Sequence, residues 1–176
     1  MTIEELREKD SDFNSSIFIS KVNIAVKKMY YAVALNQLDT CDCFIGDRVL
    51  EKLKEKIKKA YDDGLRIIYN DVNVKAEIRE INIVDNCFQI DVMCEIKRIK
   101  YYTYLNNNKV AKGDAHNSMV VYHRFALRKR LDAKESRVYT CFGCGANINL
   151  NDSGICEHCG RIFDLDKFDY TIEEMY

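Results

Sequence analysis

The feature that most constrains this chain is a pair of Cys-x-x-Cys motifs near its C-terminal end. Cys141 and Cys144 form the first motif and Cys156 and Cys159 the second; eleven residues separate the two, and a glycine follows each directly. Two such turns bring four thiolates close enough to share one tetrahedral ion, and zinc takes four thiolate ligands at about 2.3 Å in closed structural sites. The spacing therefore predicts a zinc ribbon over residues 140–163, in which these four cysteines bind one structural Zn²⁺ ion.

The chain has eight cysteines, and alternative interpretations of them stay open. A Cys-x-x-Cys motif also serves thiol–disulfide exchange. His158 inside the second motif is an alternative candidate ligand, and Cys41 and Cys43 are a candidate metal half-site with no evident partner pair. Two motifs with matching glycines favour metal over redox chemistry. No fifth ligand stands out, so the predicted site is closed and would not activate water. Zinc held by thiolates predicts a reducing compartment, and hence the cytoplasm.

Charge and hydropathy exclude several classes of protein. Lys and Arg number 27 against 28 Asp and Glu, and the net charge of −1 argues against a general polyanion binder. The longest apolar run is seven residues, Met29–Leu35, whereas a membrane span needs about 18–20. The N-terminal sequence MTIEELREKD is acidic and has no apolar stretch, so we expect no signal peptide. We expect a cytoplasmic chain, with peripheral membrane contact left open; an upstream tether would not be visible in this sequence.

The first part of the chain has the hydrophobic periodicity of helices. Residues 1–12 are polar and acidic and are expected to form a flexible tail. From a cap at Ser15 or Ser16, apolar residues recur at helical spacing to about Leu38 in two stripes, which predicts a helix packed on two sides. The stripes are Phe18, Val22, Ala25, Met29 and Val33, and Ile17, Ile24, Tyr31, Leu35 and Leu38. Asp47 is expected to cap a second helix, which Asp62-Asp63-Gly64 ends.

From Val72 the apolar period changes to two, which predicts strands. The first strand covers residues 72–79, and Val84-Asp85-Asn86 is the expected hairpin turn. The second covers residues 88–104, with Phe88, Ile90, Val92, Cys94 and Ile96 on one face. A third covers residues 118–131, and a short fourth covers residues 137–140. Helices followed by an antiparallel meander predict an α+β fold, in which the helices pack on one face of a curved antiparallel sheet.

Several segments between Phe13 and Leu131 follow the pattern of a known family. They are the helix containing KMYYAVALNQLD, the helix ending DDGLRIIYNDVNV, and the strands VKAEIREINIV, CFQIDVMCEIKRI and MVVYHRFALRK. This pattern resembles the Tim44-like domain of the nuclear-transport-factor-two-like superfamily, so we assign residues 13–139 to such a domain. The resemblance implies a cone-shaped, cystatin-like fold with a hydrophobic pocket between helix and sheet, and a role in membrane-surface association or protein tethering. Similar bacterial chains carry a zinc ribbon after this domain, which fits CFGCGANINLNDSGICEHCG.

The resemblance does not imply catalysis, but the superfamily includes isomerases and dehydratases with a His or Asp inside the pocket. His123 is the candidate here, because it shares a predicted apolar face with Val121 and Phe125. Asp91 falls on the face opposite Ile90 and is expected to point to solvent. No P-loop, nucleophile elbow or HExxH motif occurs, and a general base needs a partner in a dry pocket. We therefore predict that the chain is not an enzyme, with a pocket-bearing enzyme using His123 as the alternative.

Charge is unevenly distributed along the chain. Residues 97–137 contain eleven Lys or Arg and three Asp or Glu, whereas residues 161–176 contain two against five. The basic stretch suits an anionic membrane surface, a partner protein or RNA, but also a solvated sheet face balanced by acidic segments. The acidic tail, residues 164–176, is expected either to pack back on the sheet or to stay free. We predict a non-catalytic binding or tethering module that contacts a partner protein or a membrane surface, with nucleic-acid binding through the ribbon as a further alternative.

Overall fold

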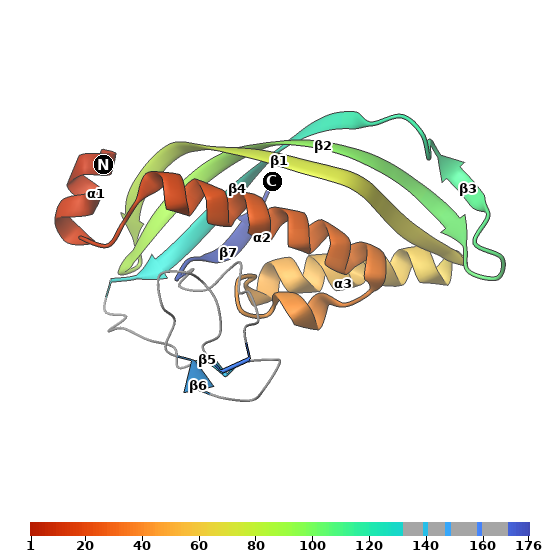
Figure 1. Ribbon diagram of the computed structural model, residues 1–176, viewed down its shortest axis with the longest axis horizontal. Helices are drawn as coiled ribbons and strands as arrows, with labels where there is room; N and C mark the ends of the chain where they lie inside the picture. The colour runs from red at the N-terminus through yellow and green to blue at the C-terminus, as the bar shows by residue number, and fades with distance from the viewer. Residues whose placement is uncertain (132–138, 141–146, 149–157, 160–168) are drawn as a thin grey trace.

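The computed structural model describes residues 1–131, 139–140, 147–148, 158–159 and 169–176. Its elements are α1 (Ile3–Lys9), α2 (Ser15–Leu35), the 3₁₀ helix η1 (Leu38–Cys41), α3 (Asp47–Asp62), β1 (Leu65–Val84), β2 (Cys87–Tyr104), β3 (Val110–Gly113), β4 (Met119–Arg130), β5 (Tyr139–Thr140), β6 (Asn147–Ile148) and β7 (Thr171–Met175). Figure 1 shows long curved strands that arch over α2 and α3. The predicted α+β fold, with helices on one face of a curved antiparallel sheet, is confirmed for the described residues.

The main sheet is antiparallel and has the strand order β1-β2-β4-β7, with β3 pairing to β2. The predicted hairpin turn is confirmed: Asp85 and Asn86 take left-handed φ values of 50° and 60°, which Asp and Asn tolerate. Strand β1 begins at Leu65 rather than at Val72. A register shift lies between Asn70 and Asn73, where Asp71 has a φ of 49°. This bulge interrupts the period of two and conceals the start of the strand in the sequence.

Helix α2 lies against the sheet, and one of its faces forms much of the core. The stripe from Phe18 to Val33 is buried as predicted. The second stripe was wrong at Ile17 and Leu35, which lie in the terminal turns of α2 and are 59 % and 65 % exposed. Its last residue, Leu38, lies beyond α2 in η1 and is buried. Asn14, one residue before the predicted cap, accepts a hydrogen bond from the Ile17 amide at 3.0 Å. None of the described helices is long and apolar enough to cross a bilayer.

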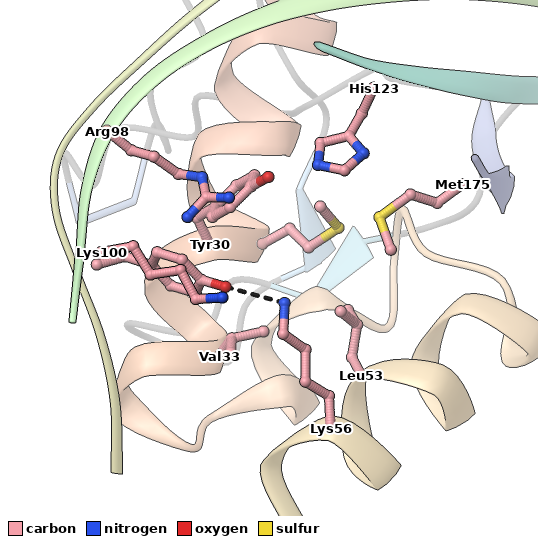
Figure 2. Close-up of a pocket in the computed structure, with 10 residues that line it drawn as sticks. Tyr30, Val33, Leu53, Lys56, Arg98, Lys100, His123 and Met175 are labelled. Atoms are coloured by element: carbon pink, nitrogen blue, oxygen red, sulfur yellow. Dashed lines mark hydrogen bonds between the residues drawn. The ribbon is translucent and has the colours of Figure 1, made fainter. Parts of the chain in front are cut away.

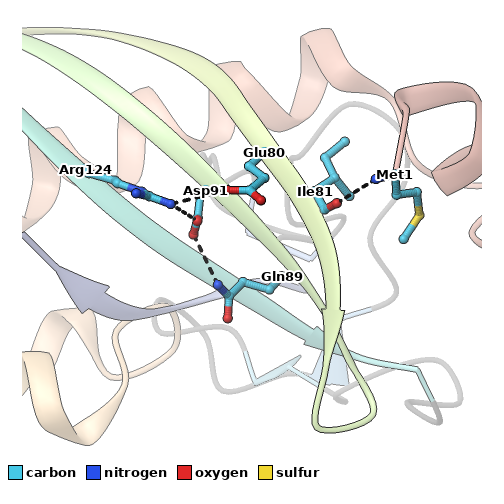
Figure 3. Close-up of polar contacts among 6 residues, drawn as sticks. All are labelled: Met1, Glu80, Ile81, Gln89, Asp91 and Arg124. Carbon is cyan, nitrogen blue, oxygen red and sulfur yellow. Dashed lines mark hydrogen bonds and ion pairs between the residues drawn. The ribbon is translucent and has the colours of Figure 1, made fainter.

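Residues 1–12, where a flexible tail was expected, contain the short helix α1. Thr2 and Glu5 form a capping box at its start, and Leu6 is fully buried. The amino group of Met1 donates a hydrogen bond to the Ile81 carbonyl at 3.1 Å (Figure 3). These contacts fix the N-terminal segment against β1, so it is part of the folded domain.

The C-terminal segment returns to the sheet as β7. Ile172 pairs with Leu127 of β4, is fully buried, and donates its backbone N–H to the Phe44 carbonyl at 2.9 Å. The described end of the acidic tail therefore joins the sheet as a strand beside β4, rather than packing on the basic face of the sheet or staying free. The domain limits near residues 140 and 163 stay predictions.

Asp91 on β2 does not point to solvent, and that prediction was wrong. The residue is only 4 % exposed. Arg124 of β4 forms an ion pair with its carboxylate, and Gln89 donates a hydrogen bond to it at 3.3 Å (Figure 3). The alternation of side chains placed Asp91 on the correct outer face, but long neighbouring side chains cover that face here.

Candidate functional site

A cavity of about 250 Å³ lies between α2, α3 and the sheet. Its apolar wall consists of Met29, Val33, Leu53 and Met175, and its polar wall of Tyr30, Lys56, Tyr69, Arg98, Lys100 and His123. Figure 2 shows side chains from both helices and from β2, β4 and β7 converging on this space. None of the ten lining residues is Asp or Glu. The pocket implied by the family resemblance is therefore present, but its wall joins apolar and basic groups and is not purely hydrophobic.

Arg98 is the most deeply buried charged residue in this wall. Alternation along β2 places it on the same face as Ile96, and only 7 % of it is exposed. Its guanidinium carbon lies 5.0 Å from the centre of the Tyr69 ring and 5.3 Å from that of Tyr30. Such cation–π contacts offset part of the cost of removing the charge from water. The Nε and Nη1 atoms of Arg98 have no hydrogen-bond partner among the described residues.

Tyr30 and Tyr69 form an aromatic pair beside Arg98. Their ring centres are 4.8 Å apart, and the rings meet edge to face at 84°. Burial raises the pKa of Tyr30 to about 12, although the charge of Arg98 and a hydrogen bond to it act in the opposite direction. Burial also raises the pKa of Tyr69, against the charges of Lys100 and Arg98. Both phenols are therefore neutral near pH 7 and do not compensate the charge of Arg98.

Lys56 brings a second cation into the cavity from α3. Its Nζ donates a hydrogen bond to the Tyr69 hydroxyl at 2.9 Å (Figure 2), while part of its side chain remains exposed on the helix. Burial lowers the pKa of Lys56, the charge of Arg98 lowers it further, and Tyr102 opposes both. A negative group in the cavity would therefore be attracted by two partly desolvated cations at once.

A second cavity of about 270 Å³ adjoins the first, because Lys56 lines both. Tyr102 and Lys112 belong to its wall, together with one acidic residue, Asp63. The ammonium groups of Lys112 and Lys100 lie 4.4 Å and 5.3 Å from the centre of the Tyr102 ring. The basic character of the interior thus continues to the end of the sheet where β3 pairs with β2.

His123 lies on the inner face of β4, as predicted, and lines the first cavity. It stands opposite Cys94 of β2, and its Nδ1 is 3.2 Å from the backbone carbonyl of Tyr176. Because a carbonyl oxygen only accepts, this hydrogen bond requires the proton on Nδ1. Burial lowers the pKa of His123, and the charges of Arg98 and Lys56 lower it further. The imidazole is therefore mainly neutral near pH 7.

The predicted zinc ligands lie mostly outside the described residues. This applies to Cys141, Cys144 and Cys156, while Cys159 is described at an exposed turn with His158. Strands β5 and β6 pair antiparallel, and residues 141–146, which contain the first motif, lie between them in the sequence. In the described part of the chain, no three or more His, Cys, Asp or Glu side chains are placed to hold a metal ion.

Cys41 and Cys43, considered as a metal half-site, differ in their surroundings. Cys41 is buried, and Cys43 is exposed. Burial raises the pKa of Cys41 to about 11, a shift that a hydrogen bond from Thr40 partly opposes. Metals bind thiolates, so this environment disfavours a metal ligand at Cys41.

The basic residues of the cavity were not predicted as site residues. A signal was present for two of them, since Arg98 and Lys100 continue the alternation of Ile90, Val92, Cys94 and Ile96 on the inner face of β2. Lys56 gave no such signal, because it lies among several lysines of an amphipathic helix. The position of its ammonium depends on how α3 packs against Tyr69.

Comparisons with known proteins give one match that bears on function. A family model described as Tim44-like domain matches residues 1–140. Among solved structures, the chain is similar to the crystal structure of the intermembrane space region of chloroplast protein ARC6, with a TM-score of 0.43 and 9 % sequence identity, over 100 % of this chain and 95 % of that chain. We draw nothing from so low a likeness. No curated protein matches.

Proposed function

The chain belongs to the Tim44-like domain family, and on this basis we propose that it is a non-catalytic binding module that associates with an anionic membrane surface. The family match covers residues 1–140, so the proposal concerns the helices and the curved sheet. A partner protein is the second candidate contact, and the experiment below separates the two.

The observation that carries this proposal is a basic and apolar surface where β3 pairs with β2, here called the sheet-end surface. It consists of four apolar side chains that are 46–51 % exposed, and of three exposed lysines: Tyr104, Val110, Met119 and Val120, with Lys97, Lys109 and Lys112. Strand pairing places them around one end of the sheet, on both of its faces, with Val110 opposite Thr103, Met119 opposite Arg98, and Val120 opposite Lys97. Asp114 is the only acidic residue between positions 97 and 131.

This composition suits the interface of an acidic membrane. Each lysine near such a surface contributes about 1 kcal/mol of attraction, and apolar side chains that enter the headgroup region add to it. The whole chain has a net charge of −1, so the attraction has to be local to the sheet-end surface.

The setting of His123 supports a non-catalytic role. A histidine that acts as general base is commonly oriented by a carboxylate, and its charged form is stabilised there. The described residues that line its cavity include no Asp or Glu, and the charges of Arg98 and Lys56 oppose its protonation. A histidine that resists protonation is a poor proton acceptor.

We further propose that the segment after this domain is a zinc ribbon that holds one structural Zn²⁺ through Cys141, Cys144, Cys156 and Cys159. The donor set supports it, because four thiolates are the typical ligands of a closed zinc site. The pairing of β5 with β6 on either side of the first motif also supports it. Such a short segment buries too little apolar surface to fold unaided, so the ion would supply local folding free energy.

Co-sedimentation with phosphatidylcholine vesicles, with and without phosphatidylglycerol, tests the membrane proposal. We expect binding to require the acidic lipid and to weaken with added salt. Val120→Asp should weaken binding about tenfold, or ~1.4 kcal/mol. Ile83→Asp is the matched control, because Ile83 is exposed to a similar extent, 45 % against 47 %, near the opposite end of the sheet.

Equal binding to the two kinds of vesicle, or equal binding of the two variants, would contradict the membrane proposal. Capture of a protein partner that is sensitive to Val120→Asp and not to Ile83→Asp, without vesicle binding, would assign the sheet-end surface to a protein instead. A salt-dependent mobility shift with short RNA would assign it to nucleic acid.

A further inference from the structure

We propose that the cavity lined by Arg98 is a receptor for a small organic anion. The carboxylate or phosphate group of this ligand contacts the Arg98 guanidinium, and its short apolar body lies against Met29, Val33, Leu53 and Met175. The proposal goes beyond the proposed function, because it concerns the interior cavity and not the sheet-end surface, and either one can fail alone.

Arg98 has hydrogen-bonding capacity that the described residues do not meet. An arginine side chain stays protonated in proteins, and burying an unpaired charge is costly. Arg98 is 7 % exposed, and its Nε and Nη1 atoms have no acceptor among the described residues. The rings of Tyr30 and Tyr69 attract the charge but do not accept hydrogen bonds from these two atoms. An oxyanion in the cavity would supply the missing acceptors.

In the part of the chain that the structure describes, Arg98 differs from two other charged residues with buried or mostly buried side chains, which have ion-pair partners. Asp91 forms an ion pair with Arg124, and Lys129 forms one with Asp10 at 2.8 Å. Among the described residues, no carboxylate lies within ion-pair distance of Arg98, and the same holds for Lys56 and Lys100 in the same cavity wall. The positive charge of the cavity is therefore not compensated within the described fold.

The size and shape of the cavity define the class of ligand. Its volume of about 250 Å³ is below the ~300–1,000 Å³ typical of sites for drug-sized ligands, so it suits a small ligand. The four apolar side chains would be left uncovered by a simple inorganic ion. Two of them are methionines, whose flexible side chains adapt to ligands of different outline. A short aliphatic or aromatic acid can contact the apolar wall with its body and the basic wall with its carboxylate, whereas a cation would be repelled by Arg98, Lys56 and Lys100.

Isothermal titration calorimetry with sodium hexanoate, in a buffer free of other organic acids and of phosphate, tests this proposal. Hexanamide is the matched neutral probe, since it has nearly the same shape without the charge. We expect hexanoate to bind the wild-type chain at least about tenfold more tightly than hexanamide. Arg98→Met should abolish this preference, and Arg98→Lys should retain part of it because the charge is kept.

Arg79→Met is the control variant, because it makes the same substitution at an exposed arginine of β1 and should bind hexanoate as the wild type does. Arg98→Met should fold with a comparable melting temperature, since a buried unpaired charge contributes little to stability. If Arg98→Met does not fold, Arg98→Lys and Lys100→Met are measured in its place. Each is expected to lower the affinity for hexanoate several-fold.

The same anionic group could belong to a free acid or to a lipid headgroup, and a second arm distinguishes these sources. Phosphatidylcholine vesicles with and without phosphatidic acid are compared for binding of the wild type, Arg98→Met and Arg79→Met. Arg98-dependent binding of hexanoate assigns the cavity to free acids, and Arg98-dependent binding of the acidic vesicles alone assigns it to a headgroup. Equal affinity for hexanoate and hexanamide, together with binding of acidic vesicles that does not depend on Arg98, would overturn the proposal.

Discussion

The ammonium group of Lys129 on β4 lies 2.8 Å from the carboxylate of Asp10, at the end of α1. Asp169, just before β7, places its carboxylate 3.4 Å from the same ammonium. The side chains of Lys129 and Asp10 are only 16 % and 11 % exposed. One partly buried cation thus joins the two ends of the chain to a central strand.

Removing this cation should destabilise the domain. Burial alone would lower the pKa of Lys129, but the hydrogen bonds and charges of Asp10 and Asp169 raise it above its usual value, so the folded state favours the charged amine. Lys129→Met leaves Asp10 buried without its partner, and we expect a loss of about 1.5–3 kcal/mol in the free energy of unfolding. Urea denaturation measures this. Lys54→Met, which removes an exposed pair with Glu51 on α3, should cost less than ~0.5 kcal/mol; equal losses would show that the Lys129 contact is not stabilising.

We expect the protein to become less stable toward unfolding at acidic pH because of His123. Its pKa is lowered in the folded state, by burial first and then by Arg98 and Lys56, whereas in the unfolded chain a histidine titrates near about 6.5. Above that pH both states are neutral, and as the pH falls through it the unfolded state gains a proton that the folded state resists. The melting temperature of the wild type should therefore drop between about pH 7 and about pH 5 more than that of His123→Gln. His116→Gln, in an exposed loop, controls for the loss of one histidine, and identical pH profiles of wild type and His123→Gln would contradict this prediction.

The hydrogen bond between Asn23 of α2 and Ala76 of β1 should stabilise the packing of α2 against the edge of the sheet. The Asn23 side-chain oxygen accepts the Ala76 backbone N–H of β1 at 2.8 Å. Asn23→Ala removes the acceptor from a partly buried donor, so we expect a loss of about 1–2 kcal/mol in the free energy of unfolding. Chemical denaturation of Asn23→Ala is compared with that of Asn106→Ala, which changes an exposed loop residue. A loss no greater than that of the control would show that water replaces the amide.

The zinc ribbon is tested by elemental analysis of the chain purified without chelators. We expect one zinc per chain, and Cys141→Ser should lose it because three thiolates do not close the site. Cys87→Ser, at the start of β2, is the matched control and should keep the metal. Circular dichroism should show that Cys141→Ser retains the helices and the sheet. Absence of zinc from the wild type, together with pairwise disulfides among these cysteines, would refute the ribbon.

Alternation along the strands made much of the sheet predictable, because the inner-face residues from Phe88 to Ile96 are buried as a period of two requires. The same rule puts Arg98 on the inner face. It does not reveal that Arg98 lacks a carboxylate partner, because this depends on its pairing with Met119 and on where α2 and β1 place Tyr30 and Tyr69. The chemistry of the site thus arises from tertiary packing that no local pattern encodes.

Two other differences between the prediction from sequence and the structure have identifiable causes. Helix α1 was missed although the Thr2–Glu5 spacing is that of a capping box, because its polar composition outweighed the single buried apolar residue, Leu6. The burial of Asp91 was missed because alternation tells on which face a residue lies and not what covers that face. Arg124 covers it from β4, far away in the sequence.

The most direct test of the anion receptor follows the Arg98 side chain itself. The protein is labelled with ¹⁵N, the Nε–H resonance of Arg98 is assigned by its loss in Arg98→Met, and hexanoate and hexanamide are titrated separately. We predict that hexanoate shifts this resonance in a saturable manner, at the concentrations at which heat of binding is observed, and that hexanamide leaves it in place. A resonance that stays in place while hexanoate is added to saturation, or that responds equally to both probes, would contradict the account.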